Sequence, residues 1–372
     1  MKIHQENIVE QSEIKHFEKF SPDFILCFST LNAEKAKPFL ELLKKQNPNT
    51  KIIGCSSQKN IYDVNIIDRV LTLTYIAFET SNIQLNFMAF DCQASSYKNG
   101  LKYAQNQENK NLNHLILFTT SPINGSSFLQ GLQDEISSKV KLTGGIASIP
   151  NVSEATYVIY DGKTYCNAVV SINIYGKETQ VGFGSEGGWD SFGIERQVTK
   201  SNRNIVYELD GQNVLDLYKS YLGDLVYQLP DVAVLFPFSL RTSEHHKPIV
   251  RSVLEIDEEN KSLIFGGNIP QNSFVKLMKA NVDRLISGAE TSAKSALHAT
   301  TSSPSLALLV SCRGRLPVLK QLAEEEIEIV KETLGSQVYI TGFYSNGEFA
   351  PSNDKENSVL HNQTMTITTF SE

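Results

Sequence analysis

Residues 23–54 read DFILCFSTLNAEKAKPFLELLKKQNPNTKIIG, and this stretch determines the class of fold that we expect. Residues 23–29 form a short apolar run with the composition of a strand. Residues 33–45 place Ala36, Leu40 and Leu43 at helical spacing, and residues 51–54 form a second short strand. A strand, a helix and a strand within about thirty residues predict a βαβ-like unit.

The rest of the N-terminal half mixes this pattern with antiparallel hairpins. Residues 69–78 and 82–90 alternate apolar and polar side chains around a polar turn, which predicts a hairpin. A second strand–helix–strand pattern is expected at residues 114–119, 126–138 and 140–142. Antiparallel strands are then expected at residues 155–160, 165–175 and 179–184, the first two joined by an Asp161-Gly162 turn.

The C-terminal half continues in the same mixed style. A hairpin is expected at residues 194–209 and a helix at residues 212–222, with Gly223 at its C-cap. Further elements are expected as strands at 232–238, 249–256, 262–265, 306–311, 337–344 and 362–370, and as a helix at 281–297.

The clearest helical pattern in the chain covers residues 317–334. Pro317 lies in its first turn and Gly335 follows its end. Its apolar face is formed by Leu319, Leu322, Ala323, Ile327, Val330 and Leu334. Its solvent-exposed face is expected to carry Glu324, Glu325, Glu326, Glu328 and Glu332.

These patterns predict a fold between α/β and α+β. We expect two mixed-sheet halves, residues 1–197 and 198–372, each with helices packed on a largely antiparallel sheet. No short-period repeat and no long linker rich in proline or serine is visible in the sequence.

The composition excludes several classes of protein. The chain has 372 residues, 34 Lys and Arg against 41 Asp and Glu, and a net charge of −7, which argues against a primarily nucleic-acid-binding role. Its five cysteines are odd in number and widely spaced, which fits neither a disulfide framework nor a structural zinc site. No signal-like leader and no apolar run near the ~20 residues of a membrane span is visible, so we expect a soluble cytoplasmic protein.

Three short motifs suggest other chemistry and are rejected. Residues 182–187 match G-x-G-x-x-G, but the glycine-rich residues 188–193 that follow cannot open the helix that a dinucleotide site needs. Ser126 and Ser127 follow Asn124-Gly125 and are expected to cap a helix. His245-His246 lacks the spacing of a zinc-binding helix and is expected in an exposed loop.

Polar side chains gather at strand ends in the C-terminal quarter. A buried strand runs into Cys312-Arg313-Gly314-Arg315 before a helix, an arrangement that can bind an anion, and Arg315 can grip a carboxylate. The alternatives are that Arg315 caps the neighbouring acidic helix, that Cys312 is a small buried side chain and that His361 is structural. We expect one ligand pocket, with no catalytic residue, formed by Cys312, Arg315, Tyr344, Glu348, His361 and Asn362.

These residues carry a resemblance to a known family. Cys312–Arg315, Gly342-Phe343-Tyr344 with Gly347-Glu348 and Pro351, and Leu360-His361-Asn362 with Thr364 resemble the motifs of FIST proteins, bacterial sensory modules with an N-terminal and a C-terminal half. Further similar positions are Gly54-Cys55-Ser56, Gly144-Gly145, Gly187-Gly188-Trp189, Gly193, Val198-Thr199, residues 208–211 and residues 221–223. The chain departs from the pattern at Lys59-Asn60, where the family tends to carry Gly-Glu, and at Ser345-Asn346, which replaces Thr-Tyr.

The resemblance implies a cytoplasmic signal-transduction sensor and not an enzyme. Such a protein binds a small molecule, for example an amino-acid-like metabolite, and regulates a partner such as a histidine kinase or a diguanylate cyclase. The resemblance covers nearly the whole chain, so we expect FIST halves alone and output through a partner protein. One alternative is a haem-based nitric oxide sensor of the same family, with His361 as the first candidate axial ligand and His114 and His298 as others. A second alternative is an enzyme that uses Cys312 as a nucleophile.

Overall fold

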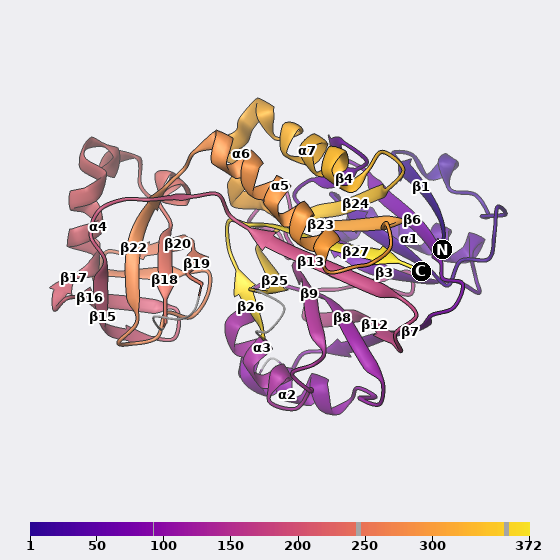
Figure 1. Ribbon diagram of the computed structural model, residues 1–372, viewed down its shortest axis with the longest axis horizontal. Helices are drawn as coiled ribbons and strands as arrows, with labels where there is room; N and C mark the ends of the chain where they lie inside the picture. Colours follow the sequence, from indigo (N-terminus) through magenta and orange to yellow (C-terminus); the bar gives the residue numbers. More distant parts are fainter. Residues whose placement is uncertain (92, 243–246, 353–356) are drawn as a thin grey trace.

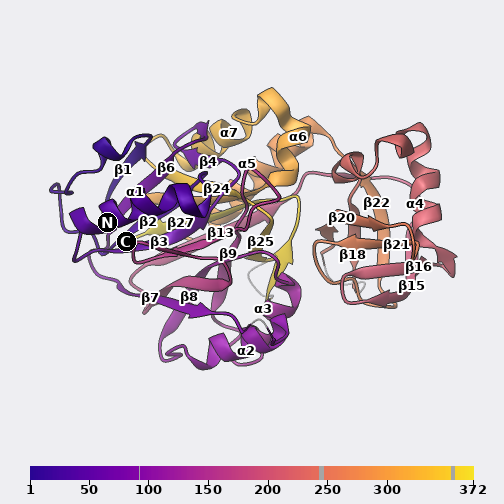
Figure 2. The same ribbon diagram turned by 180° about the vertical axis from the view of Figure 1, so that it is seen from behind.

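The computed structural model describes residues 1–91, 93–242, 247–352 and 357–372. These residues form a large body and a smaller lobe, which stands beside the body in the views of Figures 1 and 2. The chain enters the lobe after β13 (Gln180–Glu186) and returns to the body at α5 (Val282–His298). The lobe is therefore an insertion, and the body contains chain from both sides of it.

The body consists of three units with the same order of elements. Each unit has an outer strand, a parallel strand pair joined by a helix, a hairpin and a return strand. The first unit is β1 (Lys2–Ile8), β2 (Phe24–Ser29), α1 (Ala33–Gln46), β3 (Lys51–Ser56), β4 (Asn60–Tyr62), β5 (Asn65–Ile67) and β6 (Leu71–Ala77). The second is β7 (Asn82–Ala89), α2 (Ser96–Gln105), β8 (Leu112–Thr119), α3 (Gly125–Gln133), β9 (Lys141–Ile146), β10 (Val158–Tyr160), β11 (Lys163–Tyr165) and β12 (Ala168–Tyr175).

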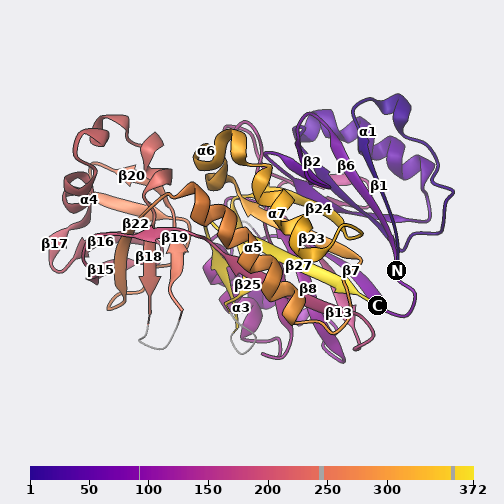
Figure 3. The ribbon, with the colours of Figure 1, turned by 45° about the horizontal axis from the view of Figure 1, so that its top comes forward.

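The third unit contains the inserted lobe. It consists of β13, α5, β23 (Leu306–Cys312), α6 (Leu316–Leu319), α7 (Glu325–Leu334), β24 (Tyr339–Ser345), β25 (Gly347–Pro351), β26 (Ser358–His361) and β27 (Met365–Ser371). Figure 3 shows α5 and α7 side by side on one face of this unit.

Each unit gives its hairpin to the sheet of another unit. The sheet orders are β1-β6-β2-β3-β10-β11, β7-β12-β8-β9-β25-β26 and β13-β27-β23-β24-β4-β5. The first unit thus completes the third sheet, the second completes the first, and the third completes the second. Because β4 pairs with β24, and β25 pairs with β9, the sheets join strands from both sides of residue 197.

One glycine recurs at the same place in all three units. Gly54, Gly144 and Gly342 lie opposite Cys27, Leu117 and Leu309 in the parallel pairs. A Cβ at these glycines would lie 1.8, 2.0 and 2.0 Å from the partner's carbonyl oxygen. A side chain there would force the two central strands apart, so the close approach of each pair requires glycine.

The three sheets face one another across a shared apolar core. Phe28, Phe118 and Phe343, one from each unit, have ring centroids 4.9 to 5.7 Å apart. All three side chains are fully buried. Offset and edge-on aromatic packing of this kind stabilises the centre beyond simple burial.

The lobe has its own sheet and core. Its sheet order is β19-β18-β22-β15-β16-β21-β20, and α4 packs on β16 and β21. The strands are β14 (Asp190–Ser191), β15 (Arg196–Asn202), β16 (Ile205–Leu209), β17 (Gln212–Asn213), β18 (Phe238–Arg241), β19 (Ile249–Arg251), β20 (Val253–Asp257), β21 (Ser262–Phe265) and β22 (Phe274–Lys279), and the helix is α4 (Val214–Leu222).

The predicted fold class is confirmed, because helices pack on mixed and antiparallel sheets throughout. Several local predictions are wrong. Residues 69–78 and 82–90 do not form a hairpin with each other, because β6 pairs with β1 and β2 while β7 pairs with β12 in another sheet. Residues 317–334 are not one helix, since Lys320 adopts a left-handed φ of 52° and separates α6 from α7. Residues 231–235 form a 3₁₀ helix, and the strand begins only at Phe238. Asn124, not Ser126 or Ser127, caps α3 through its side chain.

Some residues considered in the sequence analysis cannot be compared with the structure. Cys92, His245 and His246 lie outside the described residues. Across the described ranges, no helix is long and apolar enough to cross a membrane.

Candidate functional site

A cavity of about 1000 Å³ lies where the body meets the lobe, and we call it the cleft. On the body side its lining follows the ends of the central strands: Gln58 and Lys59 after β3, Ile123 after β8, Ile146 at the end of β9, and Arg313 and Asn346 after β23 and β24. On the lobe side it is lined by residues 230–234, residues 252–254 and Gly266. The carboxyl ends of parallel strands are common ligand sites in mixed sheets.

Hydrogen bonds hold the three strand ends together at the floor of the cleft. The Gln58 N–H donates to Ser148 Oγ at 2.8 Å, and the Tyr344 N–H donates to the Lys59 carbonyl at 3.0 Å. Asn346 Nδ2 donates to the Ala147 carbonyl at 2.8 Å. The exchange of hairpins therefore brings one loop from each unit to the same place.

Polar groups connect the lobe to the body around the cleft. Arg251 Nη1 donates to the Leu360 carbonyl at 2.8 Å, and Asn268 bonds Ser126 and Asn124 at 3.1 and 2.8 Å. Gln363 Nε2 donates to the Val234 carbonyl at 3.1 Å. Interfaces of this polar character between bodies of one chain commonly permit relative motion.

The structure separates the six predicted site residues. Cys312 and Asn362 line the cleft. Arg315, Tyr344 and Glu348 are fully buried beneath its floor. His361 lines a second cavity of about 460 Å³, together with the linker residues Gly187, Gly188 and Trp189.

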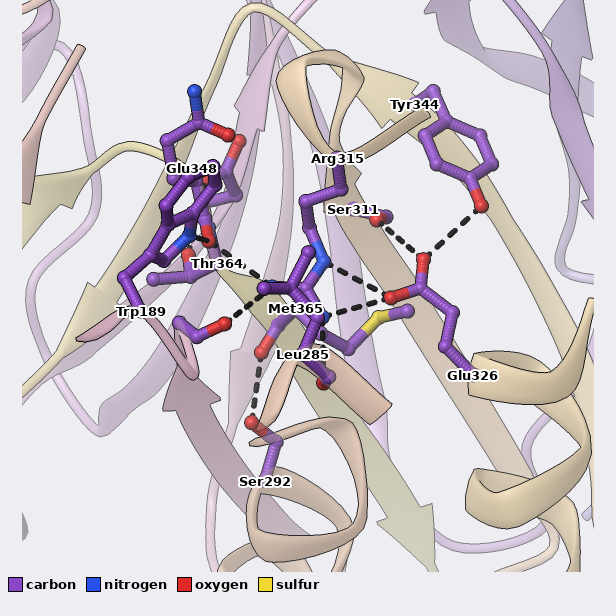
Figure 4. A network of polar contacts seen from close by, with 12 residues as sticks. Trp189, Leu285, Ser292, Ser311, Arg315, Glu326, Tyr344, Glu348, Thr364 and Met365 are labelled. Carbon is purple, nitrogen blue, oxygen red and sulfur yellow. Dashed lines mark hydrogen bonds and ion pairs between the residues drawn. The ribbon is translucent and has the colours of Figure 1, made fainter. Parts of the chain in front are cut away.

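Arg315 is the centre of a buried polar network (Figure 4). Its Nε and Nη2 donate to Glu326 Oε2 at 2.9 and 2.8 Å. Nη1 donates to the carbonyls of Gly187 and Gln363, and Nη2 also donates to that of Leu285. All five N–H groups of the guanidinium thus donate to acceptors within the protein. Arg315 has no free donor for a ligand carboxylate, in contrast to the prediction.

Glu326 corrects the prediction for the acidic helix. It was expected on the exposed face with the other glutamates, but its side chain is fully buried. Its Oε1 accepts hydrogen bonds from Ser311 Oγ and the Tyr344 hydroxyl, both at 3.1 Å. A buried cation on the neighbouring turn overrides the helical pattern, because an unpaired charge cannot remain in an apolar interior.

Glu348 forms a second buried polar group behind the cleft. It accepts hydrogen bonds from Ser345 Oγ and from the Thr364 hydroxyl and N–H. Burial raises the pKa of this carboxyl from its usual 4.5 to about 7, although these hydrogen bonds oppose the shift. Glu348 therefore titrates near neutral pH while it is out of contact with solvent.

Cys312 lies between Glu348 and the cleft. Its side chain is 4% exposed. Burial raises the pKa of its thiol well above the usual value, and the nearby Glu348 carboxyl adds to the rise. An activated nucleophile needs the opposite shift, so the thiol in this position is suited to packing.

Three residues that the sequence analysis did not select are prominent in the cleft. Arg313 lines it as a half-buried cation, and its Nη1 has one long hydrogen bond, 3.4 Å, to Asn346 Oδ1. Gln363 and Gln58 line it with side-chain oxygens that are buried without a hydrogen-bond partner. Gln363 also adopts a left-handed φ of 62° in the turn between β26 and β27. All three lie within the quoted motifs or beside them, but only the fold shows which way they face.

The three histidines considered as axial ligands already have hydrogen-bond partners within the protein. His361 Nε2 bonds the Ala350 carbonyl at 3.1 Å, His114 Nε2 bonds Thr143 Oγ1 at 2.8 Å, and His298 Nδ1 bonds the Lys294 carbonyl at 2.7 Å. The cavity beside His361 also contains Lys247, which is ion-paired with Glu186. Trp189, Ile249 and Val250 line the same cavity, so its wall is mixed, and the His361 Nε2 that would bind iron is already hydrogen-bonded. Within the described residues no group of three or more His, Cys, Asp or Glu is placed to hold a metal ion.

Comparison with known families identifies the class of this protein. The model of the FIST N domain matches residues 23–212, and that of the FIST C domain matches residues 215–351. The chain belongs to the FIST family, whose domains are associated with sensing and signal transduction.

Similarity to individual proteins gives no further information about function. An uncharacterised protein of Methanocaldococcus jannaschii, MJ1623, is 24% identical over 348 residues, which are 87% of this chain and 65% of that protein. The chain thus spans about two thirds of that relative's length. A crystal structure of chorismatase matches 100% of this chain and 98% of its own at 8% identity, and its TM-score of 0.39 supports no inference.

The Arg315–Glu326 pair yields a prediction about stability. Glu326→Gln leaves a buried arginine without its counter-charge, so we expect the free energy of unfolding to fall by about 3–5 kcal/mol in urea titrations. The matched control is Glu325→Gln, one residue away and exposed, which should change stability by less than about 0.5 kcal/mol. Equal stabilities for the two variants would show that the pair does not hold the fold.

Glu348 yields a prediction about pH. Between pH 4.5 and 7 the folded protein keeps a proton that the unfolded chain has lost, so the contribution of Glu348 to stability falls as pH rises through this window. Glu348→Gln cannot lose this proton. From pH 5 to pH 8 the variant should therefore gain on the order of 3 kcal/mol relative to wild type.

The measurement compares urea unfolding of both proteins at several pH values. His114 and His361, whose pKa values burial lowers to about 3, change stability in the opposite direction, but they do so equally in both proteins and cancel in the difference. Parallel pH profiles for the two proteins would show that Glu348 does not titrate in this range.

Proposed function

We propose that this protein is a sensor in which a small molecule binds in the cleft and shifts the lobe relative to the body. The observation that carries the proposal is the position of the cleft, between two bodies that share two chain crossings and meet through polar contacts beside the cleft and an apolar cluster around Trp189. A ligand that contacts both sides favours one relative placement, and this differential contact is what a sensor requires.

The amino-acid-like metabolite implied by the family resemblance is the first ligand class to test. The lining carries three cations, Lys59, Arg313 and Lys320, against one carboxylate, Asp231. Lys59 is ion-paired with Asp68, which leaves Arg313 as the cation at the floor. This local charge favours an anionic group although the chain as a whole is acidic. A signalling partner such as a histidine kinase or diguanylate cyclase would then respond to the new surface.

Two observations favour a sensor over the alternatives. The raised pKa of the Cys312 thiol argues against the nucleophile reading, which leaves the cleft without an activated attacking group among the residues that line it. The polar contacts of His361, His114 and His298 give no support to a haem-based sensor.

Trp189 provides an intrinsic test of ligand-dependent lobe movement. It is the one tryptophan of the chain, it lies on the crossing into the lobe, and its Nε1 donates to the Gln363 carbonyl at 3.0 Å. It packs with Val250 and Met278 of the lobe and with Leu285 of the body. We expect an amino-acid-like ligand found by thermal-shift screening to raise the melting temperature and also to change the Trp189 emission.

The stabilisation should follow the ligand concentration, reaching about 2.7 kcal/mol at a hundred times the dissociation constant. Small-angle X-ray scattering with and without the ligand checks that the emission change reports a change of shape. Binding with no change in emission or scattering would refute the proposed lobe movement.

The haem alternative has a direct test of its own. Haemin titrated into the purified protein should give no saturable Soret band at one haem per chain, because the Nε2 atom of His361 is already bonded to the Ala350 carbonyl. A stoichiometric band that shifts with nitric oxide and is lost in His361→Ala would establish haem binding instead.

A further inference from the structure

Arg313 stands out in the cleft because its charge is unmatched. Among the described residues no carboxylate forms an ion pair with it, and its Nη1 has only the long hydrogen bond to Asn346. Burial lowers the pKa of the guanidinium. Arg315, two residues away, is by contrast paired and inaccessible. A half-buried arginine that lines a cavity in this state is suited to a bidentate contact with a carboxylate.

Two buried acceptors lie in the same lining. Gln363 is fully buried, its Nε2 is held by the Val234 carbonyl of the lobe, and its Oε1 has no partner. Gln58 Oε1 is in the same condition on the other side of the floor. A buried acceptor without a hydrogen bond is costly, so a ligand in the cleft gains free energy if either side chain turns to present its oxygen to an N–H or O–H donor.

Part of the lining of the cleft is apolar. Ile123, Ile146, Val253 and Leu316 line it from both bodies. Val152 on the body and Leu254 on the lobe are 71% and 62% exposed, although large apolar side chains are usually covered. These surfaces match a ligand with an apolar group directed away from Arg313.

We propose that the ligand is an organic carboxylate that carries an N–H donor and a sizeable apolar group, of the size of an N-acylated amino acid or a dipeptide. The carboxylate binds Arg313, the donor bonds Gln363 Oε1 or Gln58 Oε1, and the apolar group lies between Val152 and Leu254. A cavity of about 1000 Å³ is large for a free amino acid and is at the upper end of ordinary ligand sites. This assignment rests on the proposed function, since it names the class of ligand for the same cleft.

Isothermal titration calorimetry with three matched probes tests the assignment. N-acetyl-L-leucine has all three features, N-acetyl-L-leucinamide lacks the carboxylate, and N-acetylglycine lacks the apolar group. We expect N-acetyl-L-leucine to bind and each of the other two to bind about tenfold more weakly or worse. Equal affinity of the amide would overturn the role of the carboxylate, and equal affinity of N-acetylglycine would overturn that of the apolar wall.

Variants of the protein locate the site. Arg313→Gln should weaken N-acetyl-L-leucine about tenfold or more, and Leu254→Ser should weaken it while leaving N-acetylglycine unchanged. Leu254 is exposed, so this variant keeps the fold. The matched control is Arg284→Gln, since Arg284 lines the second cavity and its loss should not affect binding. If Arg284→Gln weakens binding and Arg313→Gln does not, the ligand binds in the second cavity and the proposal is wrong.

The outcomes distinguish an error in the ligand class from an error in the sensor function. If none of the three probes binds while free amino acids change the Trp189 emission, the ligand class is wrong and the sensor function stands. If neither the probes nor the thermal-shift screen gives a ligand, the sensor function itself is wrong.

Discussion

The buried ion pair of Arg315 and Glu326 is the interaction on which the rest of the site depends. Its guanidinium joins α7, the N-terminal part of α5, the crossing into the lobe at Gly187 and the Gln363 carbonyl. The same carbonyl accepts the Trp189 indole N–H. Removing two opposite charges from water is costly, and only a network that uses every donor offsets that cost. The network therefore holds the floor of the cleft and the root of the lobe in one arrangement.

The second constraint is the exchange of hairpins among the three units. Each hairpin leaves the sheet of its own unit and completes the sheet of another unit. Each unit therefore depends on the other two. It also brings the ends of β3, β9 and β24 together, since each hairpin starts within the loop that follows one of these strands. Because the glycines at 54, 144 and 342 allow each parallel pair to pack closely, the loops are held at similar depth. The cleft lies where these loops meet.

The lobe is the part of the molecule that the proposed function requires to move. Its own sheet and apolar core make it a separate body, and its contacts with the main body near the cleft are hydrogen bonds to carbonyls and short polar side chains. Such contacts can be exchanged at low cost when a ligand supplies alternatives. The apolar contact around Trp189 lies at the crossing itself, which makes it the natural pivot.

The sequence by itself determined the fold class, most of the elements and the family, because hydrophobic period, turn residues and motif spacing are local properties. It also located the strand ends near Cys312, Tyr344 and Asn362 where the cleft lies. Only the tertiary structure decided which arginine is structural and which lines the cleft. Arg313 and Arg315 are two residues apart in one motif, but their environments differ because one side chain meets Glu326 and the other meets a cavity. The threefold repetition was equally hidden, since strand partners from distant residues are set by packing and leave little trace in a linear pattern beyond a recurring glycine.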